Sequence, residues 1–188
     1  MIRIGLTGSI ASGKTTASKI ISRRRGPLFS ADEVVKKIYK KTNFQKVLLK
    51  KLKIKSRSDF KKKIKNIIFS KKGALKKLEE IIHPMVRKEM LAFLKKNKNK
   101  KFLFFEIPLL IESKLTRYFD VIIFIKSKRN LRLKRFKLKK GNIKLFSLLD
   151  NHQLKDTKKV KFCDHIVVNN KSLTILKKNL LNIIKLYE

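Results

Sequence analysis

The sequence predicts an α/β fold in which a parallel β-sheet lies between two layers of helices. Short apolar runs alternate along the chain with longer segments whose apolar residues recur at helical spacing. One of these runs, residues 102–105, is apolar at every position, which is typical of a strand covered on both faces. Strands that alternate with helices favour parallel pairing, and a chain of 188 residues is long enough to form one core.

The expected elements follow in chain order. The strands are short and apolar: residues 2–7, 28–30, 102–105, 121–125 and 166–168. Apolar spacing together with glycine and proline breaks predicts helices around these strands: about 14–24, 32–40, 126–140 and 173–187.

Residues 43–100, between the second and third strands, are expected to form an all-helical insertion. Its segments have one apolar face and one lysine face, as in the spacing of Phe60, Ile64 and Ile68. Pro84 is expected in the first turn of the last of these helices, where its missing N–H leaves no hydrogen bond unmade. Asp59 is expected to begin a helix.

The chain carries 51 Lys and Arg against 13 Asp and Glu, a formal net charge of +38. Clustered cations suit a nucleic acid, because they neutralise phosphates and release counterions. Here lysine is spread along the chain, Asn, Ile and Phe are plentiful and Trp is absent, which AT-rich codons also produce. No RNP-type aromatic signature and no zinc-finger spacing are present. We therefore expect no nucleic-acid partner, and a polyanion role is the alternative.

Composition also limits the compartment. Cys163 is the only cysteine, which excludes an intramolecular disulfide and a cysteine-based zinc site. No apolar run approaches the roughly 18 residues of a membrane helix. The first residues do not resemble a signal peptide. We expect a cytoplasmic protein without a membrane partner.

The strongest motif is a glycine-rich loop between the first strand and the first helix. It matches G-x-x-x-x-G-K-[ST] at every fixed position: Gly8, Ser9, Ile10, Ala11, Ser12, Gly13, Lys14 and Thr15. Glycines let successive N–H groups face one phosphate, and the helix N-terminus adds its positive end. Lys14 is expected to bridge the β- and γ-phosphates of ATP, Thr15 to hold Mg²⁺, and Thr16 to lie at the ATP site. The motif predicts a P-loop NTPase with three α/β/α layers.

A nucleoside triphosphate site leaves the phosphate acceptor open. A GTPase would carry N-K-x-D, but residues 170–173 read Asn-Lys-Ser-Leu and lack the Asp. The chain is also short for a motor ATPase with sensor domains. A small-molecule kinase fits the length best.

Two carboxylates follow strands at the edge of the sheet where a phosphate loop lies. Asp32 comes directly after the second strand, where it can take the proton of an acceptor hydroxyl. It can equally be a helix N-cap, a role that is also open to Ser30. Glu106 ends the third strand and is expected either to hold Mg²⁺ through water or to cap the next turn.

Taken together, these motifs resemble the dephospho-CoA kinase family. The ordered set runs almost from end to end: residues 5–15, Ser30-Ala31-Asp32, Ile82-His83-Pro84, Pro108-Leu109-Leu110-Ile111-Glu112, and then Gln153, Lys159, Asp164 and Asn169. The resemblance implies a nucleotide core, a helical acceptor-binding insertion and a lid. In this chain they would be residues 1–32, 101–126 and 160–188 for the core, 33–100 for the insertion, and 127–159 for the lid.

The resemblance also implies a reaction. ATP, with Mg²⁺, would phosphorylate the ribose 3′-hydroxyl of dephospho-CoA to give CoA and ADP. Asp32 is implied as the general base, and Arg132 and Arg135 as lid cations that act with Lys14. Asn169 is implied to lie near the ATP adenine. The residues implied to face the acceptor are His83, Leu109, Leu110 and Glu112. We expect a monomer.

Some positions depart from the family pattern. Ser30 stands where the first Asp of D-A-D is usual, and Phe136 stands where an arginine partner of Arg132 is usual. Arg135 or Lys137 is expected to supply that charge, because the transition state needs a nearby cation more than it needs that cation at one fixed sequence position. Three alternatives stay open: another small-metabolite or nucleoside kinase, a nucleic-acid-stimulated ATPase, and a decayed enzyme that only binds nucleotide.

Overall fold

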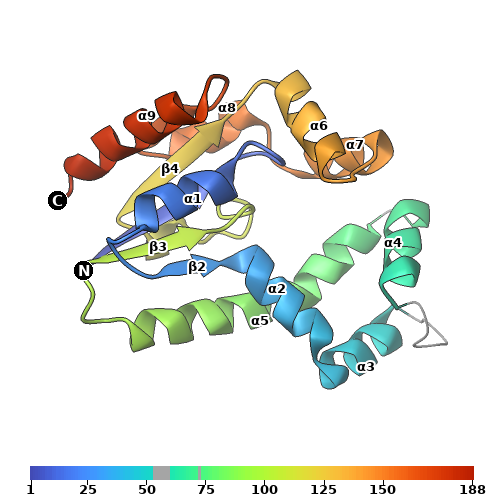
Figure 1. Ribbon diagram of the computed structural model, residues 1–188. Coiled ribbons are helices and arrows are strands. Elements are labelled where there is room, and N and C mark those ends of the chain that lie inside the picture. Colours follow the sequence, from blue (N-terminus) through green and yellow to red (C-terminus); the bar gives the residue numbers. More distant parts are fainter. Residues whose placement is uncertain (53–59, 72) are drawn as a thin grey trace. The chain divides into compact units, whose positions relative to one another are not determined.

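The computed structural model describes residues 1–52, 60–71 and 73–188 of the chain (Figure 1). Within them the chain forms two compact units, Met1–Ser30 with Lys96–Glu188 and Ala31–Lys95. Asp59, which is expected to begin a helix, lies outside the described residues. Across the described ranges, no helix combines the length and the apolar character that crossing a membrane requires.

A five-stranded parallel sheet forms the centre of the first unit, with the strand order β2-β3-β1-β4-β5. β1 (Ile2–Thr7) is the middle strand and pairs with β3 (Phe102–Glu106) and β4 (Val121–Lys126). The edge strands are β2 (Leu28–Ser30) and β5 (His165–Val168). Every predicted strand is present, and the predicted parallel α/β class is confirmed.

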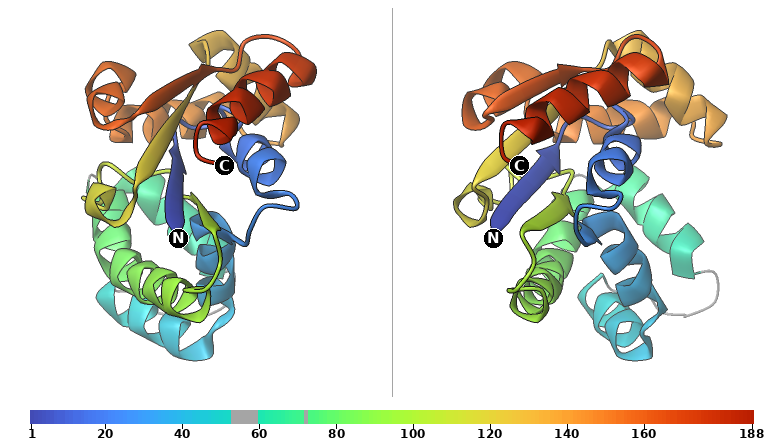
Figure 2. Two further views of the ribbon diagram at one scale, coloured as in Figure 1. Left: turned by 90° about the vertical axis from the view of Figure 1, so that its left-hand side faces the viewer. Right: turned by 60° about the vertical axis from the view of Figure 1, so that its left-hand side comes forward.

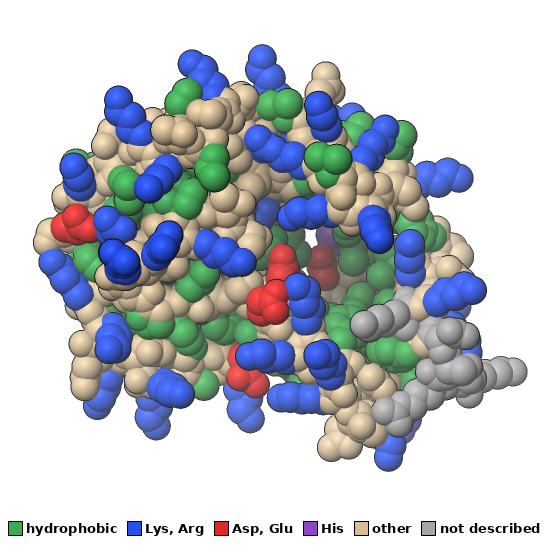
Figure 3. Space-filling view, in the orientation of Figure 1, with side chains coloured by type: hydrophobic (Ala, Val, Ile, Leu, Met, Phe, Trp, Pro, Cys, Tyr) green, Lys and Arg blue, Asp and Glu red, His purple; other side chains and the backbone are tan. Residues whose placement is uncertain are grey.

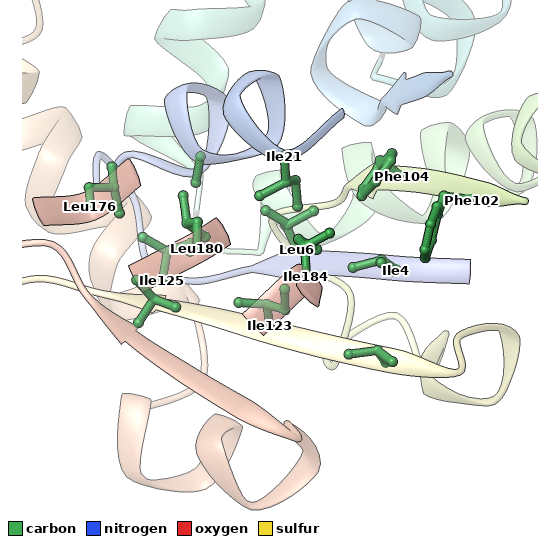
Figure 4. Close-up of a cluster of buried hydrophobic side chains, with 13 residues drawn as sticks. Ile4, Leu6, Ile21, Phe102, Phe104, Ile123, Ile125, Leu176, Leu180 and Ile184 are labelled. Atoms are coloured by element: carbon green, nitrogen blue, oxygen red, sulfur yellow. The ribbon is translucent and has the colours of Figure 1, made fainter. Parts of the chain in front are cut away.

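One face of the sheet is covered by α1 (Lys14–Ser22) and α9 (Leu173–Lys185), which run next to each other (Figure 2). Alternate strand residues such as Ile4 and Leu6 point to this face, where they meet Ile21 of α1 and Leu180 of α9 (Figure 4). These four side chains are completely buried. The apolar residues at every second position of the strand and those at helical spacing in α1 and α9 therefore pack into one core.

The opposite face is covered in part by the segment that follows β3. Gly5 has no room for a side chain, because a Cβ atom there would lie 2.8 Å from Leu110 Cδ1 and 3.1 Å from Phe119 Cγ. The Phe119 ring meets the Phe105 ring edge-on, with 5.2 Å between their centroids. Close packing against a glycine thus seats this segment directly on the sheet.

The predicted basic helix is α6 (Arg129–Leu138), and α7 (Ile143–His152) and the short α8 (Asp156–Lys159) follow it. The prediction began at residue 126, but Lys126 still belongs to β4. α6 and α7 pack through Phe136 and Phe146, whose ring centroids are 5.6 Å apart. Short 3₁₀ turns lie at Thr116–Tyr118 and Val160–Phe162.

The second unit is helical throughout its described part: α2 (Ala31–Lys40), α3 (Thr42–Lys51), α4 (Phe60–Ser70) and α5 (Ala74–Lys96). Its core gathers apolar side chains from all of these helices. The Tyr39 ring lies 5.4 Å from that of Phe44 and 6.2 Å from that of Phe60. Burial raises the pKa of Tyr39 to about 12.

Pro84 lies inside α5, so the expectation that it begins a separate helix is wrong. A proline inside a helix removes one hydrogen bond and crowds the preceding turn. The apolar stripe nevertheless continues in phase across it, from Leu78 and Ile82 to Val86 and Met90. Each such side chain contributes about 1.5–3 kcal/mol when it is buried, so packing along one continuous stripe offsets the local penalty.

The positive charge is scattered over the surface. In Figure 3, Lys and Arg side chains lie across the whole visible face, and acidic side chains are few. Asp120, for example, pairs with Arg3, and Asp164 accepts a hydrogen bond from Ile122 N–H at 2.7 Å. Every carboxylate side chain of the first unit has such a partner: Glu106, Glu112, Asp120, Asp150, Asp156, Asp164 and Glu188.

Candidate active site

The glycine-rich loop connects the carboxyl end of β1 with the start of α1. Gly8 and Gly13 have φ values of +149° and +101°, which residues with a side chain rarely adopt. A Cβ atom at Gly8 would lie 2.4 Å from the Ile125 carbonyl oxygen, and one at Gly13 would lie 2.2 Å from Asn169 Nδ2. Both glycines are therefore required by backbone conformation and by close neighbours. The first turn of α1 directs its N–H groups towards the loop, as a phosphate site needs.

Lys14 is the first residue of α1, and its side chain is turned back along the loop. Its ammonium donates a hydrogen bond to the Ser9 carbonyl oxygen at 2.9 Å. Only 7% of the residue is exposed. The ammonium is thus held at the loop, where exchange of one carbonyl oxygen for phosphate oxygens would need little movement.

Glu106 joins α1 to the end of the sheet. Thr15 Oγ1 donates a hydrogen bond to Glu106 Oε1, and Ser30 Oγ donates one to Glu106 Oε2 at 3.2 Å. Ser30 and Leu6 are the register partners of Glu106 on the two neighbouring strands. This hydroxyl and carboxylate set offers hard oxygen donors of the kind that Mg²⁺ prefers. The geometry fits the metal-directed alternative for Glu106 better than a cap on the next turn.

Asn169 and Arg135 meet the second half of the loop. Asn169 Nδ2 donates to the Ser12 carbonyl oxygen at 2.8 Å, and Arg135 Nη1 approaches the same oxygen at 3.4 Å. Arg135 Nη2 also donates to the Asn169 carbonyl oxygen at 3.0 Å. The family resemblance implies a position for Asn169 near the adenine. The structure places its amide against Ser12 and Gly13.

Arg132, the other expected lid cation, is buried beside the loop. Its Nη1 donates to Asp150 Oδ1 at 2.5 Å and lies 3.4 Å from the Ile10 carbonyl oxygen. Its Nε donates to the Ser127 carbonyl oxygen at 3.2 Å. The structure therefore brings both predicted lid arginines to the loop. The sequence pattern does not identify Asp150 as the partner of Arg132.

Two more side chains of this region contact the loop directly. Gln153 Oε1 accepts a hydrogen bond from Ile10 N–H at 2.8 Å. Asp156 Oδ1 accepts one from the Ser9 hydroxyl. Gln153 belongs to the family-like series of residues, although the sequence assigned it no contact. Asp156 was missed, and its place at the start of α8 is the only local signal it carries.

The residues expected on the acceptor side of the first unit occupy different environments. Leu110 is completely buried and packs against Gly5, so its place is that of a core residue. Leu109 is only partly buried. Glu112 Oε1 lies 2.7 Å from the ammonium of Lys159, which is completely buried, and it accepts from Leu154 N–H at 3.1 Å. In the structure, Glu112 therefore serves as the partner of Lys159.

Asp32 and His83 belong to the second unit. Asp32 is the exposed second residue of α2, so the position before the helix belongs to Ser30, whose hydroxyl bonds to Glu106. His83 lies on α5, where it lines a hollow of about 450 Å³ together with Pro84, Arg87 and other residues of the same helix. The roles of Asp32 as general base and of His83 as acceptor contact stay predictions.

Relatives of known sequence agree with the motif pattern. The dephospho-CoA kinase family model matches residues 2–174. Dephospho-CoA kinase of Rickettsia typhi is 32% identical over 186 residues, which cover 98% of this chain and 97% of the relative. Dephospho-CoA kinase of Fusobacterium nucleatum is 34% identical over 175 residues, which cover 90% of each chain.

Solved structures agree on the fold. Dephospho-CoA kinase from Campylobacter jejuni matches with a TM-score of 0.67 and 27% identity, over 97% of this chain and 95% of that one. Shikimate kinase from Acinetobacter baumannii matches with a TM-score of 0.58 over 99% of this chain and 92% of that one. At 12% identity the latter shows a shared fold alone. The predicted three-layer P-loop fold is confirmed.

Proposed function

The chain belongs to the dephospho-CoA kinase family, and we propose that it transfers the γ-phosphoryl group of ATP to the 3′-hydroxyl of dephospho-CoA. The products are CoA and ADP. The observation that carries the proposal is the P-loop with Lys14 held at its centre, in a chain that the family model matches almost throughout. The family supplies the acceptor, and the loop supplies the triphosphate site.

In the proposed transfer, the 3′-oxygen of the acceptor forms a bond to the γ-phosphorus while the bond to the bridging oxygen breaks. ADP leaves with that oxygen. Asp32 takes the proton of the 3′-hydroxyl as general base. Lys14 and the N–H groups at the start of α1 stabilise the charge that develops on the phosphoryl oxygens. Arg132 and Arg135 add positive charge from the proposed lid, residues 127–159, which keeps water from the γ-phosphate.

The oxygen donors at Thr15 and Glu106 suit Mg²⁺. When it is bound, Mg²⁺ neutralises charge on the β- and γ-phosphates of ATP. Thr15 would contribute its hydroxyl, and Glu106 would orient it and the metal's water ligands from the end of β3. Ser30, which stands where the family usually has Asp, supports Glu106 through its other oxygen.

We also propose that Leu109 and Glu112 of the first unit contact the acceptor, and that His83 of the second unit does so as well, while Leu110 serves as a core residue. Glu112 is oriented by Lys159 and by Leu154 N–H. His83 on α5 and Asp32 on α2 both belong to the second unit, residues 31–95. The protein is proposed to work as a cytoplasmic monomer.

A product assay tests the proposal. Purified protein, ATP, Mg²⁺ and dephospho-CoA are incubated, and CoA and ADP are followed by chromatography beside a reaction without acceptor. Equal amounts of CoA and ADP are expected, with little ADP in the control. ADP without CoA would contradict the acceptor, and parallel reactions with shikimate, deoxyadenosine or RNA would separate another kinase from an ATPase. A folded protein that binds ADP but makes neither product would contradict the activity.

A further inference from the structure

The first half of the phosphate loop is held by one segment far away in the sequence. Gln153 and Asp156 contact Ile10 and Ser9 of the loop. Asp150 and Lys159 lie three residues further out on either side, and each of them fixes this segment to another part of the unit. We refer to residues 150–159 as the brace.

Gln153 and Arg132 hold the two backbone groups of Ile10. The side-chain oxygen of Gln153 accepts from Ile10 N–H at 2.8 Å. The Ile10 carbonyl oxygen lies 3.4 Å from Arg132 Nη1, and Asp150 holds that guanidinium. The next residue, Ala11, has a φ of +57°, which a residue with a side chain adopts reluctantly. Contacts on Ile10 from two sides therefore help to keep the loop in a conformation that its own backbone disfavours.

Asp156 contacts Ser9, the other braced residue in the first half of the phosphate loop. Its carboxylate accepts a hydrogen bond from the Ser9 hydroxyl, and only 4% of Ser9 is exposed. The Ser9 carbonyl oxygen in turn accepts from the Lys14 ammonium at 2.9 Å. Ser9 thus connects Asp156 to Lys14, so the place of the ammonium depends on where Asp156 holds Ser9.

The brace is itself well anchored. Lys159 is completely buried and lies 2.7 Å from Glu112 Oε1, which also accepts from Leu154 N–H at 3.1 Å. A buried charge stays close to its partner, because separation would leave it without compensation. At the other end, Asp150 is tied to Arg132. Gln153 and Asp156 therefore project from a segment with two fixed ends.

We propose that Gln153 and Asp156 are positioning residues that preset Ser9 and Ile10 for the phosphates of the nucleotide. A loop already in its binding conformation loses less conformational entropy when the ligand arrives, and so it binds more tightly. Gln153 acts through Ile10, and Asp156 acts through Ser9 and Lys14. The inference rests on the proposed function for the nucleotide site only, so ADP binding without any acceptor tests it separately from the choice of acceptor.

The first experiment measures ADP affinity by titration calorimetry for Gln153→Met and Asp156→Ala. Met matches Gln in length but gives Ile10 N–H no strong acceptor. Each variant is expected to bind ADP about 5- to 10-fold more weakly, the range for one lost hydrogen bond. Thr157→Ala, at an exposed position of α8, is the matched control and should bind as the parent does. Asp156→Asn keeps an acceptor oxygen and should restore most of the affinity.

A double-mutant cycle with Ser9→Ala tests the proposed route. If Asp156 acts through the Ser9 hydroxyl, Asp156→Ala in the Ser9→Ala background should weaken ADP binding no further. Thermal unfolding of every variant separates a general loss of stability from a specific loss of affinity. ADP affinities of Gln153→Met and Asp156→Ala within twofold of Thr157→Ala would overturn the proposal, and so would additive effects in the cycle. If Gln153→Met does not fold, Asp156→Ala and its cycle with Ser9→Ala decide the proposal. If Asp156→Ala does not fold, Gln153→Met and Asp156→Asn decide it.

Discussion

Thr15 and Glu106 are 91 residues apart in the sequence, yet the Thr15 hydroxyl donates a hydrogen bond to the Glu106 carboxylate. The sheet brings them together, because β3 pairs in parallel with β1 and both strands end at the same edge. Ser30, at the end of β2, completes the group from the other side of Glu106. A polar cluster thus forms where three strands end next to the start of α1.

Glu106→Gln should weaken the response to Mg²⁺. The amide keeps the shape of the side chain but removes its charge, and loss of an orienting group beside a metal lowers affinity or activity about 10- to 100-fold. Initial rates over a Mg²⁺ series at fixed ATP measure this effect. Ser30→Ala removes only the weaker contact with Glu106 and should shift the Mg²⁺ dependence less. An unchanged Mg²⁺ dependence in Glu106→Gln would exclude the metal-directed role.

Lys14→Ala should weaken ADP binding and reduce turnover together. The buried ammonium is the loop's own positive charge, and removal of it leaves phosphate oxygens without a charged partner. Calorimetry with ADP and rates of ADP formation check both effects. Lys19→Ala, on the exposed side of the same helix, removes one charge from α1 and should change neither. A normal rate in Lys14→Ala would refute the P-loop interpretation.

Asp32→Asn should reduce turnover by about 10²- to 10⁴-fold while ADP affinity stays close to that of the parent. The amide cannot take the proton of the acceptor hydroxyl, but it changes nothing in the phosphate loop itself. Glu33→Gln is the matched control, since it removes a charge from the neighbouring exposed position of α2. Steady-state rates and ADP titrations of both variants make the comparison. Near-normal turnover in Asp32→Asn would remove the general base.

Lys159→Met should destabilise the first unit by about 3–5 kcal/mol, because the Glu112 carboxylate loses its buried partner. Adding Glu112→Leu to that variant removes the remaining charge, so the double variant should recover part of the loss. Urea unfolding of the parent, both single variants and the double variant gives these free energies. A single variant within about 1 kcal/mol of the parent, the range of exposed pairs, would show that the pair is not energetically buried.

The Arg3–Asp120 pair predicts a small acid sensitivity. Hydrogen bonds from the Arg3 guanidinium hold the pKa of Asp120 below its usual value. A depressed carboxyl pKa stabilises the fold above the unfolded-state value, near 3.8, and this contribution is lost as the pH falls through the folded-state pKa. Both side chains are about one-third exposed, so the expected contribution is below about 1 kcal/mol. Urea unfolding of Asp120→Asn should differ from the parent at pH 7, and the difference should shrink as the pH falls below 3.8 and disappear below the folded-state pKa of Asp120.

Features with one local cause were predictable from the sequence. The phosphate loop depends on residues at fixed spacing, and Gly8 and Gly13 have the backbone conformations that the motif requires. The strands depend on apolar runs of limited length, and β1 and β2 have the bounds that the runs predict. In both cases the deciding residues are neighbours in the chain.

Features that depend on distant partners were not predictable. The stripe that keeps α5 continuous through Pro84 involves packing against α2, α3 and α4, which outweighs the local preference of proline. The expected lid cation Arg132 is held by Asp150, and no local sequence pattern predicts that pair. Asp156 meets Ser9 across 147 positions of sequence. Parts of the candidate site that join segments so far apart become visible only in the fold.

The full use of carboxylates in the first unit has a consequence for the solution around it. Each acid there already has a partner within the fold, so most of the lysines draw their counter-ions from the buffer. At 0.1 M salt these ions lie within a Debye length of about 10 Å. When a nucleotide binds, its phosphates then displace smaller buffer anions that were loosely associated with the lysine side chains. Near neutral pH, the binding of nucleoside triphosphates should therefore depend more on the valence of the buffer anion than on the pH.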